Sequence, residues 1–339
     1  MRARRRRLLH LRRALIVCVA LALLALIIAT PIWIINGVRH RADQSDGEVT
    51  PTTTATTATP TTAPTKPVAA VTDEQTVQLT DEVDAKYAVL LDMTDGRVVA
   101  EKNADQTHAP ASITKVLTLL TAVENMEDLN TPYTMSWKVI DPAYKAGANT
   151  TGLESGETVR LEDLLYGCGL RSGADATAAL ADYAADGEAD YGADDEATFA
   201  AMMNERARQL GATNTHFTNA SGMDAQGHVT TARDMALIMA EAMRNPVCRQ
   251  VLMTEEYLLP ATEQHPEGIQ LYSNLFNTVD KAVIKAGKTG WTPMAGNTLV
   301  TYTVGTDGHE YVCVTMQNAG HRAALADTLK LYKDYCGLE

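Results

Sequence analysis

Two hairpin signals, one near each end of the globular sequence, constrain the fold more than any other feature. Each consists of two β-prone runs, joined in one case across Asp95-Gly96 and in the other across Asp307-Gly308, and Asp-Gly between such runs is a strong short-range indicator of a hairpin. The sequence between the two hairpins is mainly helical in pattern, so strand and helix do not alternate, which excludes a doubly wound α/β fold. We expect an α+β fold, with an antiparallel sheet flanked by helices plus a helical lobe. The runs are Ala88–Leu91 with Arg97–Ala100, and Thr298–Val304 with Tyr311–Met316.

The helical part contains one interruption that matters for function. A predicted helix over Leu161–Gly167 is broken at Gly169 and at Ser172-Gly173, and a second helix follows over Ala174–Ala185. Ser172 therefore lies at a turn between helices, where a side chain can point into a cleft between the lobe and the sheet. Further helices are predicted over Phe199–Leu210, Thr231–Arg244 and Ala323–Cys336.

The first 35 residues have the pattern of a membrane anchor. Residues 14–35 are apolar except for Thr30 and Pro31, which is about the 20 residues that a spanning helix needs. Seven arginines precede this run, so residues 1–13 are predicted to be cytoplasmic and the rest of the chain extracellular. A cleaved signal peptide is the alternative, with Ala29-Thr30 as its site, but the apolar run continues past that site. We expect an uncleaved single-pass anchor in the lipid bilayer of the cell membrane.

A threonine-rich segment separates the predicted anchor from the globular sequence. Residues 50–67 contain ten threonines and four prolines, a composition that favours extended backbone and cannot bury a core. We expect a stalk over residues 36–80 and a catalytic domain over residues 81–339. The first 41 residues carry nine arginines and no acid, whereas the whole chain has 29 basic and 42 acidic residues. The extracellular part is therefore strongly acidic, which argues against a nucleic-acid partner.

A hydroxyl and an amine stand three residues apart at the start of an apolar helical run. Ser112 and Lys115 follow Pro110, a residue tolerated at a helix start, and residues three apart share a helix face. A serine needs a neighbouring base to become a nucleophile, and a lysine acts as that base only if its pKa falls by roughly 3 units. Alone, this spacing also fits an ordinary helix cap. A second lysine nearby would favour the catalytic interpretation.

Three short motifs occur in order: Ser112-Ile-Thr-Lys115, Ser172-Gly-Ala174 and Lys288-Thr-Gly290. Together they match the S-x-x-K, S-D-N and K-T-G set of penicillin-binding proteins and class A β-lactamases. From Lys86 to Tyr335 the chain resembles the low-molecular-mass penicillin-binding proteins, the serine-type D-alanyl-D-alanine carboxypeptidases of peptidase family S11. Further matching stretches are Ala109-Pro-Ala-Ser-Ile-Thr-Lys115, Leu164-Leu-Tyr-Gly167, Phe217-Thr-Asn219 with Gly222, His228-Val-Thr-Thr-Ala-Arg-Asp-Met235 and Lys288-Thr-Gly-Trp-Thr292 with Ala295-Gly296.

The resemblance implies an activity and a role for each motif residue. The expected reaction removes the terminal D-alanine from peptidoglycan stem peptides, and the expected covalent inhibitors are β-lactams. Ser112 is expected to form an acyl-enzyme, Lys115 to take its proton, and Ser172 to relay a proton to the leaving D-alanine. The expected substrate-binding residues are Lys288, Thr289, Gly290, Trp291 and Arg322, of which Lys288 and Thr289 hold the terminal carboxylate. The backbone N–H groups of Ser112 and Trp291 would bind the oxyanion.

Two features depart from the family pattern. The second motif usually ends in Asn, whereas this chain has Ala174, so reduced turnover or a changed substrate preference is expected. The given sequence also continues for about 50 residues after Lys288, and we therefore expect the β-rich C-terminal domain of many members to be missing.

Two other functions are compatible with the motifs. A class A β-lactamase would need a glutamate to activate water, and Glu241 and Asn245 have the spacing of that family's pair. A β-lactam-sensing or wall-binding protein would be acylated without turning over, as Ala174 could permit. A zinc carboxypeptidase is disfavoured because the eight histidines show no metal-ligand spacing, and we expect neither a metal nor another cofactor.

Overall fold

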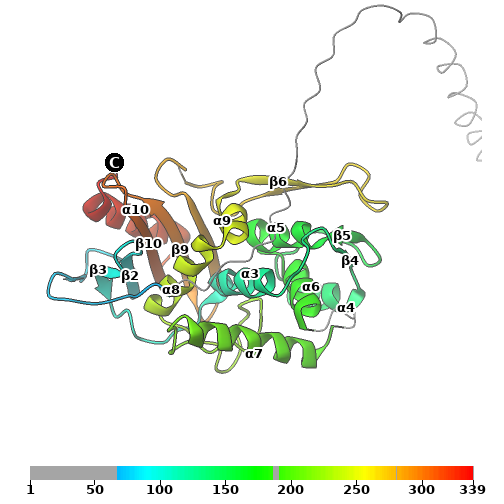
Figure 1. Ribbon diagram of the computed structural model, residues 1–339, viewed down its shortest axis with the longest axis horizontal. Coiled ribbons are helices and arrows are strands. Elements are labelled where there is room, and N and C mark those ends of the chain that lie inside the picture. The colour runs from blue at the N-terminus through cyan, green and yellow to red at the C-terminus, as the bar shows by residue number, and fades with distance from the viewer. Residues whose placement is uncertain (1–66, 186–190, 280, 339) are drawn as a thin grey trace, which may run out of the picture. The chain divides into compact units, whose positions relative to one another are not determined.

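The computed structural model describes residues 67–185, 191–279 and 281–338. The described part contains a six-stranded sheet in the order β1-β3-β2-β10-β9-β8 (Figure 1). All neighbours are antiparallel except β1 and β3, which pair in parallel, so the predicted sheet is antiparallel apart from its short first strand. The strands are β1 (Val77–Gln78), β2 (Tyr87–Asp92), β3 (Arg97–Lys102), β8 (Ala286–Thr292), β9 (Gly296–Val304) and β10 (Glu310–Asn318).

Both predicted hairpins form, and they meet in the middle of the sheet. β2 pairs with β3, β9 pairs with β10, and β10 also pairs with β2, which joins the two ends of the domain. Alternate residues of β2 belong to different cores: Val89 and Leu91 lie in the larger apolar cluster, and Ala88 and Leu90 in the smaller one. A strand buried on both faces explains why β2 is a continuous apolar run.

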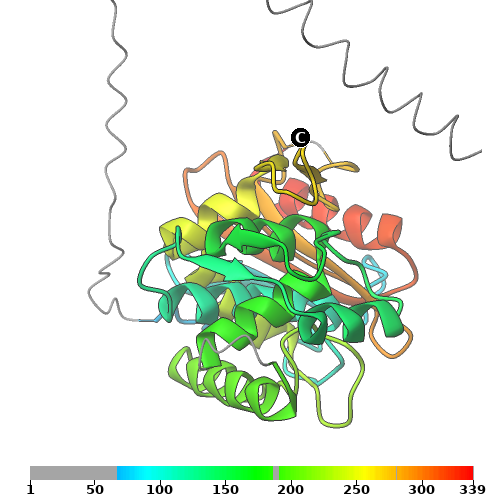
Figure 2. The ribbon, with the colours of Figure 1, turned by 90° about the vertical axis from the view of Figure 1, so that its right-hand side faces the viewer.

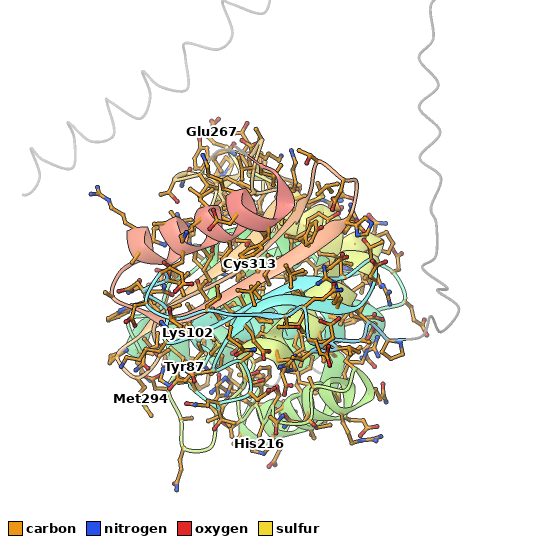
Figure 3. All side chains as sticks on the ribbon, turned by 90° about the vertical axis from the view of Figure 1, so that its left-hand side faces the viewer. Tyr87, Lys102, His216, Glu267, Met294 and Cys313 are labelled. Carbon is orange, nitrogen blue, oxygen red and sulfur yellow. The ribbon has the colours of Figure 1, made fainter. Side chains whose placement is uncertain are left out.

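Helices cover both faces of the sheet (Figure 2). α10 (His321–Cys336) packs on one face, over β9 and β10, where Cys313 of β10 lies beneath it (Figure 3). α8 (Ala232–Arg244) packs on the other face, and α3 (Lys115–Glu124) lies behind it. Residues 115–123 of α3 are all buried, as expected for a helix at the centre of a core.

The helical lobe is built around α3. Its helices are α4 (Trp137–Lys145), α5 (Leu161–Arg171), α6 (Ala174–Ala185), α7 (Ala193–Gln209) and α9 (Pro246–Met253). Two small antiparallel hairpins accompany them. In one, β4 (Pro132–Thr134) pairs with β5 (Thr158–Arg160), and in the other, β6 (Glu256–Leu259) pairs with β7 (Ile269–Tyr272). Figure 3 shows Glu267, between β6 and β7, at the opposite end of the molecule from His216.

Several predicted boundaries differ from the structure. α5 continues through Gly169 and ends only at Ser172, because one glycine inside a helix costs only about 1 kcal/mol. α7 begins at Ala193, six residues before the predicted start, with three acids in its first turn, where carboxylates favour the helix dipole. α10 begins at His321, so Arg322 belongs to its first turn.

The predicted anchor over residues 14–35 and most of the predicted stalk over residues 36–80 lie outside the described residues. No helix in the described part is long and apolar enough to cross a bilayer. Where the stalk is described, its end already packs on the domain. Val68 and Leu79 are buried and β1 pairs with β3, so the folded domain begins before the predicted boundary at residue 81.

Candidate active site

The candidate nucleophile Ser112 lies in a 3-10 turn, η1 (Ala111–Thr114), directly before α3. A 3-10 helix has three residues per turn, so side chains three positions apart stand above one another. Lys115 therefore faces Ser112, and its Nζ donates to the Ser112 Oγ at 3.2 Å. The same Nζ also donates to the Ser221 carbonyl, which fixes the direction of the amine. The sequence predicted that Ser112 and Lys115 would pair in the first turn of a helix, and in the structure they pair across a 3-10 turn.

The backbone just before the nucleophile is held in a conformation that alanine rarely adopts. Ala111 has φ of 52°, in the left-handed region that costs an L-residue about 1 kcal/mol or more. Gly222 packs directly on it, because a Cβ on Gly222 would lie 2.0 Å from the Ala111 carbonyl oxygen. The Thr114 hydroxyl donates to that oxygen at 2.8 Å. Packing therefore sets the orientation of the peptide that leads into Ser112.

His228 holds Thr114 in place through a defined tautomer. Its Nδ1 accepts from the Thr218 N–H at 3.0 Å, so the ring proton is on Nε2, which lies 3.0 Å from the Thr114 Oγ1. Donation thus runs from His228 to Thr114 and on to the Ala111 carbonyl. Burial lowers the pKa of His228 to about 4, which keeps the ring neutral at physiological pH.

Ser172 is placed by the end of α5. It ends the helix in the left-handed conformation, with φ of 59°, and Gly173 follows because a Cβ there would lie 2.3 Å from the Thr151 Oγ1. Ser172 is only 5% exposed, and its Oγ has no hydrogen-bond partner within the described part of the chain. Because an unpaired buried hydroxyl is costly, this oxygen is available for a partner that arrives in the cavity it lines.

Strand β8 brings the third motif against the nucleophile. A Cβ on Gly290 would lie 2.9 Å from the Ser112 backbone nitrogen and 2.4 Å from the Thr298 Oγ1, so the strand approaches η1 as closely as its glycine allows. The Thr298 hydroxyl donates to the Pro110 carbonyl at 2.9 Å, which ties β9 to the same segment. Trp291 is 63% exposed at the cavity rim.

Two buried lysines share this region. Burial lowers the pKa of Lys115 to about 8, against the opposing effect of Cys168 and Asp175. Burial and then repulsion by Lys115 lower the pKa of Lys288 to about 7, and the Lys288 Nζ donates to the Thr289 carbonyl at 3.0 Å. The family resemblance implies that a positive charge on Lys288 helps to keep Lys115 neutral. In the structure burial is the main cause of the lowered pKa for both amines.

These residues surround a cavity of about 810 Å³. Ser112, Lys115, Ser172, Thr289, Gly290 and Trp291 all line it, so the structure brings these predicted site residues together. Lys288 is buried, and its amine contacts the carbonyl of Thr289, which lines the cavity. The cavity wall includes the side chains of Lys115 and His321, whereas no aspartate or glutamate of the described residues is part of it. The described part of the cavity wall therefore presents no negative charge to a ligand.

Arg322 is the exception among the predicted site residues. It is exposed on the first turn of α10 and does not line the cavity, whereas the preceding residue, His321, does. The His321 Nε2 lies 3.1 Å from the Thr278 Oγ1, and burial lowers the pKa of His321. Sequence reasoning missed His321 because a histidine beside an arginine gives no signal of which side chain faces the cavity. It also missed the Ser221 carbonyl, which no side-chain pattern can reveal.

The pair that a class A β-lactamase would use lies elsewhere. Glu241 pairs with Arg206 at 3.0 Å, and the Asn245 side chain accepts from the Val247 and Cys248 N–H groups as the cap of α9. Neither residue lines the cavity. Their spacing on the sequence therefore reflects an ion pair and a helix cap, and the cavity holds no carboxylate of theirs to activate a water.

The comparisons with known proteins agree with this geometry. The Streptomyces K15 DD-transpeptidase has a similar structure, with a TM-score of 0.69 and 25% identity, and the match covers 77% of this chain and 100% of that one. The D-alanyl-D-alanine carboxypeptidase from Mycobacterium tuberculosis H37Rv gives a TM-score of 0.63 at 28% identity, over 81% of this chain and 97% of that one. The fold and the Ser-Lys pair thus define a penicillin-binding-protein-like α+β protein.

The sequence comparisons identify the family. The model of the D-alanyl-D-alanine carboxypeptidases, peptidase family S11, matches residues 72–320, and the chain belongs to this family. It is 34% identical to the D-alanyl-D-alanine carboxypeptidase DacA of Escherichia coli K12 over 227 residues, which are 65% of this chain and 53% of DacA. It is also 34% identical to DacB2 of Mycobacterium tuberculosis over 64% of this chain and 69% of DacB2. The chain thus spans about half the length of the E. coli relative.

Proposed function

We propose that this protein is a serine D-alanyl-D-alanine carboxypeptidase that removes the terminal D-alanine from peptidoglycan stem peptides. The observation that carries the proposal is the pair formed by Ser112 and Lys115. The two side chains are 3.2 Å apart, and burial lowers the pKa of the lysine to about 8. A substantial fraction of Lys115 is therefore neutral near physiological pH and able to take the serine proton.

The terminal carboxylate of the substrate would determine which of the two lysines, Lys288 or Lys115, is protonated. When the terminal carboxylate enters beside Thr289 and His321, an opposite charge near Lys288 raises the pKa of that amine. A protonated Lys288 in turn favours the neutral form of Lys115, since two buried positive charges repel each other. Binding the correct end of the peptide would thus prepare the base.

The chemistry proceeds through two transfers at Ser112. The Ser112 Oγ attacks the carbonyl of the peptide bond between the two D-alanines while its proton passes to Lys115. The oxyanion would be held by the N–H groups of Ser112 and Trp291, and a Cβ on Gly290, the residue before Trp291, would lie 2.9 Å from the Ser112 backbone nitrogen. The proton then passes by way of the Ser172 hydroxyl to the nitrogen of the leaving D-alanine, and the C–N bond breaks. Water hydrolyses the remaining ester, with Lys115 again as the base.

β-Lactams would acylate Ser112, and the resulting acyl-enzyme would be hydrolysed slowly. Hydrolysis of the penicilloyl ester by a class A β-lactamase needs a glutamate that activates the water, and the described cavity wall has no carboxylate. We therefore infer long-lived acylation by penicillins and slow turnover of nitrocefin. Fast turnover would favour the lactamase interpretation.

We also propose that the enzyme acts outside the cell while anchored in the membrane by residues 14–35. The support is the sequence pattern of an arginine-rich start, a 22-residue apolar run and a Thr/Pro-rich segment. Protease treatment of intact cells that removes the domain and leaves an N-terminal fragment in the membrane would support this topology. Recovery of the domain from the cytoplasmic fraction would contradict it.

The decisive experiment measures release of D-alanine from a stem pentapeptide by the wild type and by Ser112→Ala, together with the mass of each protein after incubation with benzylpenicillin. We expect release and a penicilloyl adduct with the wild type only. An adduct without any release of D-alanine would indicate a β-lactam sensor. Release by Ser112→Ala would refute the mechanism.

A further inference from the structure

Two large aromatic side chains are exposed on one side of α4. Trp137 and Tyr144 are 62% and 60% exposed, whereas Val139 and Ala143 on the other side of the helix are buried. Residues seven apart are separated by almost two full turns of an α-helix, so the two aromatic side chains lie on the same side. We call this pair the aromatic face. Its apolar surface is in water, and contact with a ligand would bury it.

The spacing of the aromatic face matches the repeat of a carbohydrate chain. Trp137 and Tyr144 lie about 10.5 Å apart along the helix, since each residue of an α-helix rises about 1.5 Å. This is about the length of one disaccharide unit of β-1,4-linked sugars. The C–H groups of such a sugar form an apolar face that an aromatic ring can cover, and burial of both surfaces is favourable. Each ring could therefore contact one sugar, one repeat apart.

A charged pair lies beside the two rings on the same helix. The Lys145 Nζ donates to the Asp141 Oδ2 at 2.5 Å, and the two side chains are 76% and 45% exposed. A carboxylate accepts hydrogen bonds and an ammonium group donates them, so the pair can bind the hydroxyl groups around a sugar ring. Because the two charges are opposite, the pair exerts no net attraction on an anionic membrane surface. Aromatic rings with a neutral polar pair fit an uncharged carbohydrate better.

The end of α4 connects the aromatic face to the active site. The helix ends at Lys145, and residues 146–148, which follow it directly, line the active-site cavity. The Cα atom of Tyr144 lies at most about 7.6 Å from that of Ala146, because consecutive Cα atoms are about 3.8 Å apart. Trp137 begins the helix and is farther along the chain from the cavity. Figure 1 shows α4 in the helical lobe, beside α6.

We propose that the aromatic face of α4 binds the β-1,4-linked glycan chain to which the stem peptide of the substrate is attached. This inference rests on the proposed function, because it places the stem peptide in the active-site cavity. An extended pentapeptide spans at most about 17 Å, so the glycan attached to its first residue stays near the mouth of the cavity. The enzyme would then act on peptides carried by a glycan chain in preference to free peptides.

Binding of glycan without peptide tests the aromatic face directly. The probe is soluble peptide-free glycan, released from cell-wall sacculi by an amidase and titrated calorimetrically into the full chain. We expect Trp137→Ala and Tyr144→Ala each to weaken binding at least about fivefold, because contact with an aromatic ring is lost. Trp137→Phe retains a ring and should keep most of the affinity. Tyr272→Ala, which removes a 48% exposed aromatic side chain from β7, is the matched control and should bind as the wild type does.

The release of D-alanine provides a second measurement. The same pentapeptide is supplied free or attached to glycan strands. We expect the wild type to have a KM at least about fivefold lower for the attached peptide with a similar kcat, because contacts remote from the reacting atoms stabilise the bound substrate and the transition state equally. The double variant Trp137→Ala/Tyr144→Ala should have equal KM values for the two substrates. Its activity on the free peptide should match that of the wild type.

The outcomes separate this proposal from the proposed function. Release of D-alanine with equal KM values in the wild type, and no binding of peptide-free glycan, overturns the aromatic-face proposal and leaves the proposed function intact. Glycan affinity that neither alanine variant changes also overturns it. Binding that both variants weaken, without D-alanine release from either substrate, supports glycan binding at α4 and refutes the proposed function. A dimer that Trp137→Ala dissociates in analytical ultracentrifugation, without glycan binding, assigns the face to a second copy of the chain and overturns the proposal.

Discussion

Replacing Gly290 by alanine tests whether the spacing between β8 and the nucleophile controls the rate. The new Cβ would lie 2.4 Å from the Thr298 Oγ1, 2.9 Å from the Ser112 backbone nitrogen and 3.1 Å from the Ala111 Cβ. The Thr298 hydroxyl cannot simply rotate away without losing its bond to the Pro110 carbonyl. The strand and η1 must therefore separate by several tenths of an ångström.

This separation acts on the proposed oxyanion site, because the Ser112 N–H is one of its two donors. Misplacement of a catalytic group by about 1 Å costs about 10²-fold in rate, and full loss of one oxyanion donor costs about 10²–10³-fold. We expect Gly290→Ala to lower kcat for D-alanine release by about 10²-fold, or about 2.7 kcal/mol in the activation barrier, with a much smaller change in KM.

The assay compares steady-state release of D-alanine and the rate of penicillin acylation between the wild type and Gly290→Ala, with circular dichroism and thermal melting to establish folding. Gly320→Ala is the control, because a Cβ there meets no atom within 4 Å and its φ of −168° is extended backbone. A folded Gly290→Ala protein with kcat within twofold of the wild type would refute the reasoning.

Three further predictions follow from the buried titratable groups and the cavity wall. First, kcat/KM should be greatest between about pH 7 and pH 8, the window set by Lys288 and Lys115, and fall about tenfold per pH unit below it, because both amines are then protonated and Lys115 cannot act as the base; a flat profile between pH 5 and 8 would contradict this. Second, the pKa of His228 is lowered from 6.5 to about 4, so its contribution to stability is present above pH 6.5 and is lost as the pH falls towards 4. Urea unfolding should show a loss of about 3 kcal/mol over that range that is absent in His228→Gln. Third, His321→Ala should raise KM about tenfold with little change in kcat, because a hydrogen bond to the substrate carboxylate is lost, whereas Arg322→Ala should leave KM unchanged; the reverse result would restore Arg322 as the carboxylate ligand.

Local signals in the sequence predicted much of the fold. The Asp-Gly turns predicted both hairpins, and the helix over Thr231–Arg244 appears with Thr231 as its cap. Local signals did not predict that α5 would continue through Gly169, since the packing of its neighbours overrides a single glycine. They also could not predict the pairing of β2 with β10, which depends on contacts more than 200 residues apart.

The active site also has features that the sequence predicted and features that it did not. The motifs predicted which side chains converge, because each carries a recognisable residue type at a fixed spacing. They gave no indication of the left-handed Ala111, the Ser221 carbonyl or the second cavity beside the active site. Each of these depends on backbone geometry or on space between elements, and the residues involved are common types with no pattern of their own.

The pairing of β2 with β10 also governs when the protein can become active. Ser112 lies in the first third of the domain and β8 near its end, and the two meet only in the closed sheet. Such long-range pairing forms slowly. A chain still emerging from synthesis carries its serine without the strand that completes the site, so an immature molecule should be inert towards both peptide and penicillin until its last hairpin has docked.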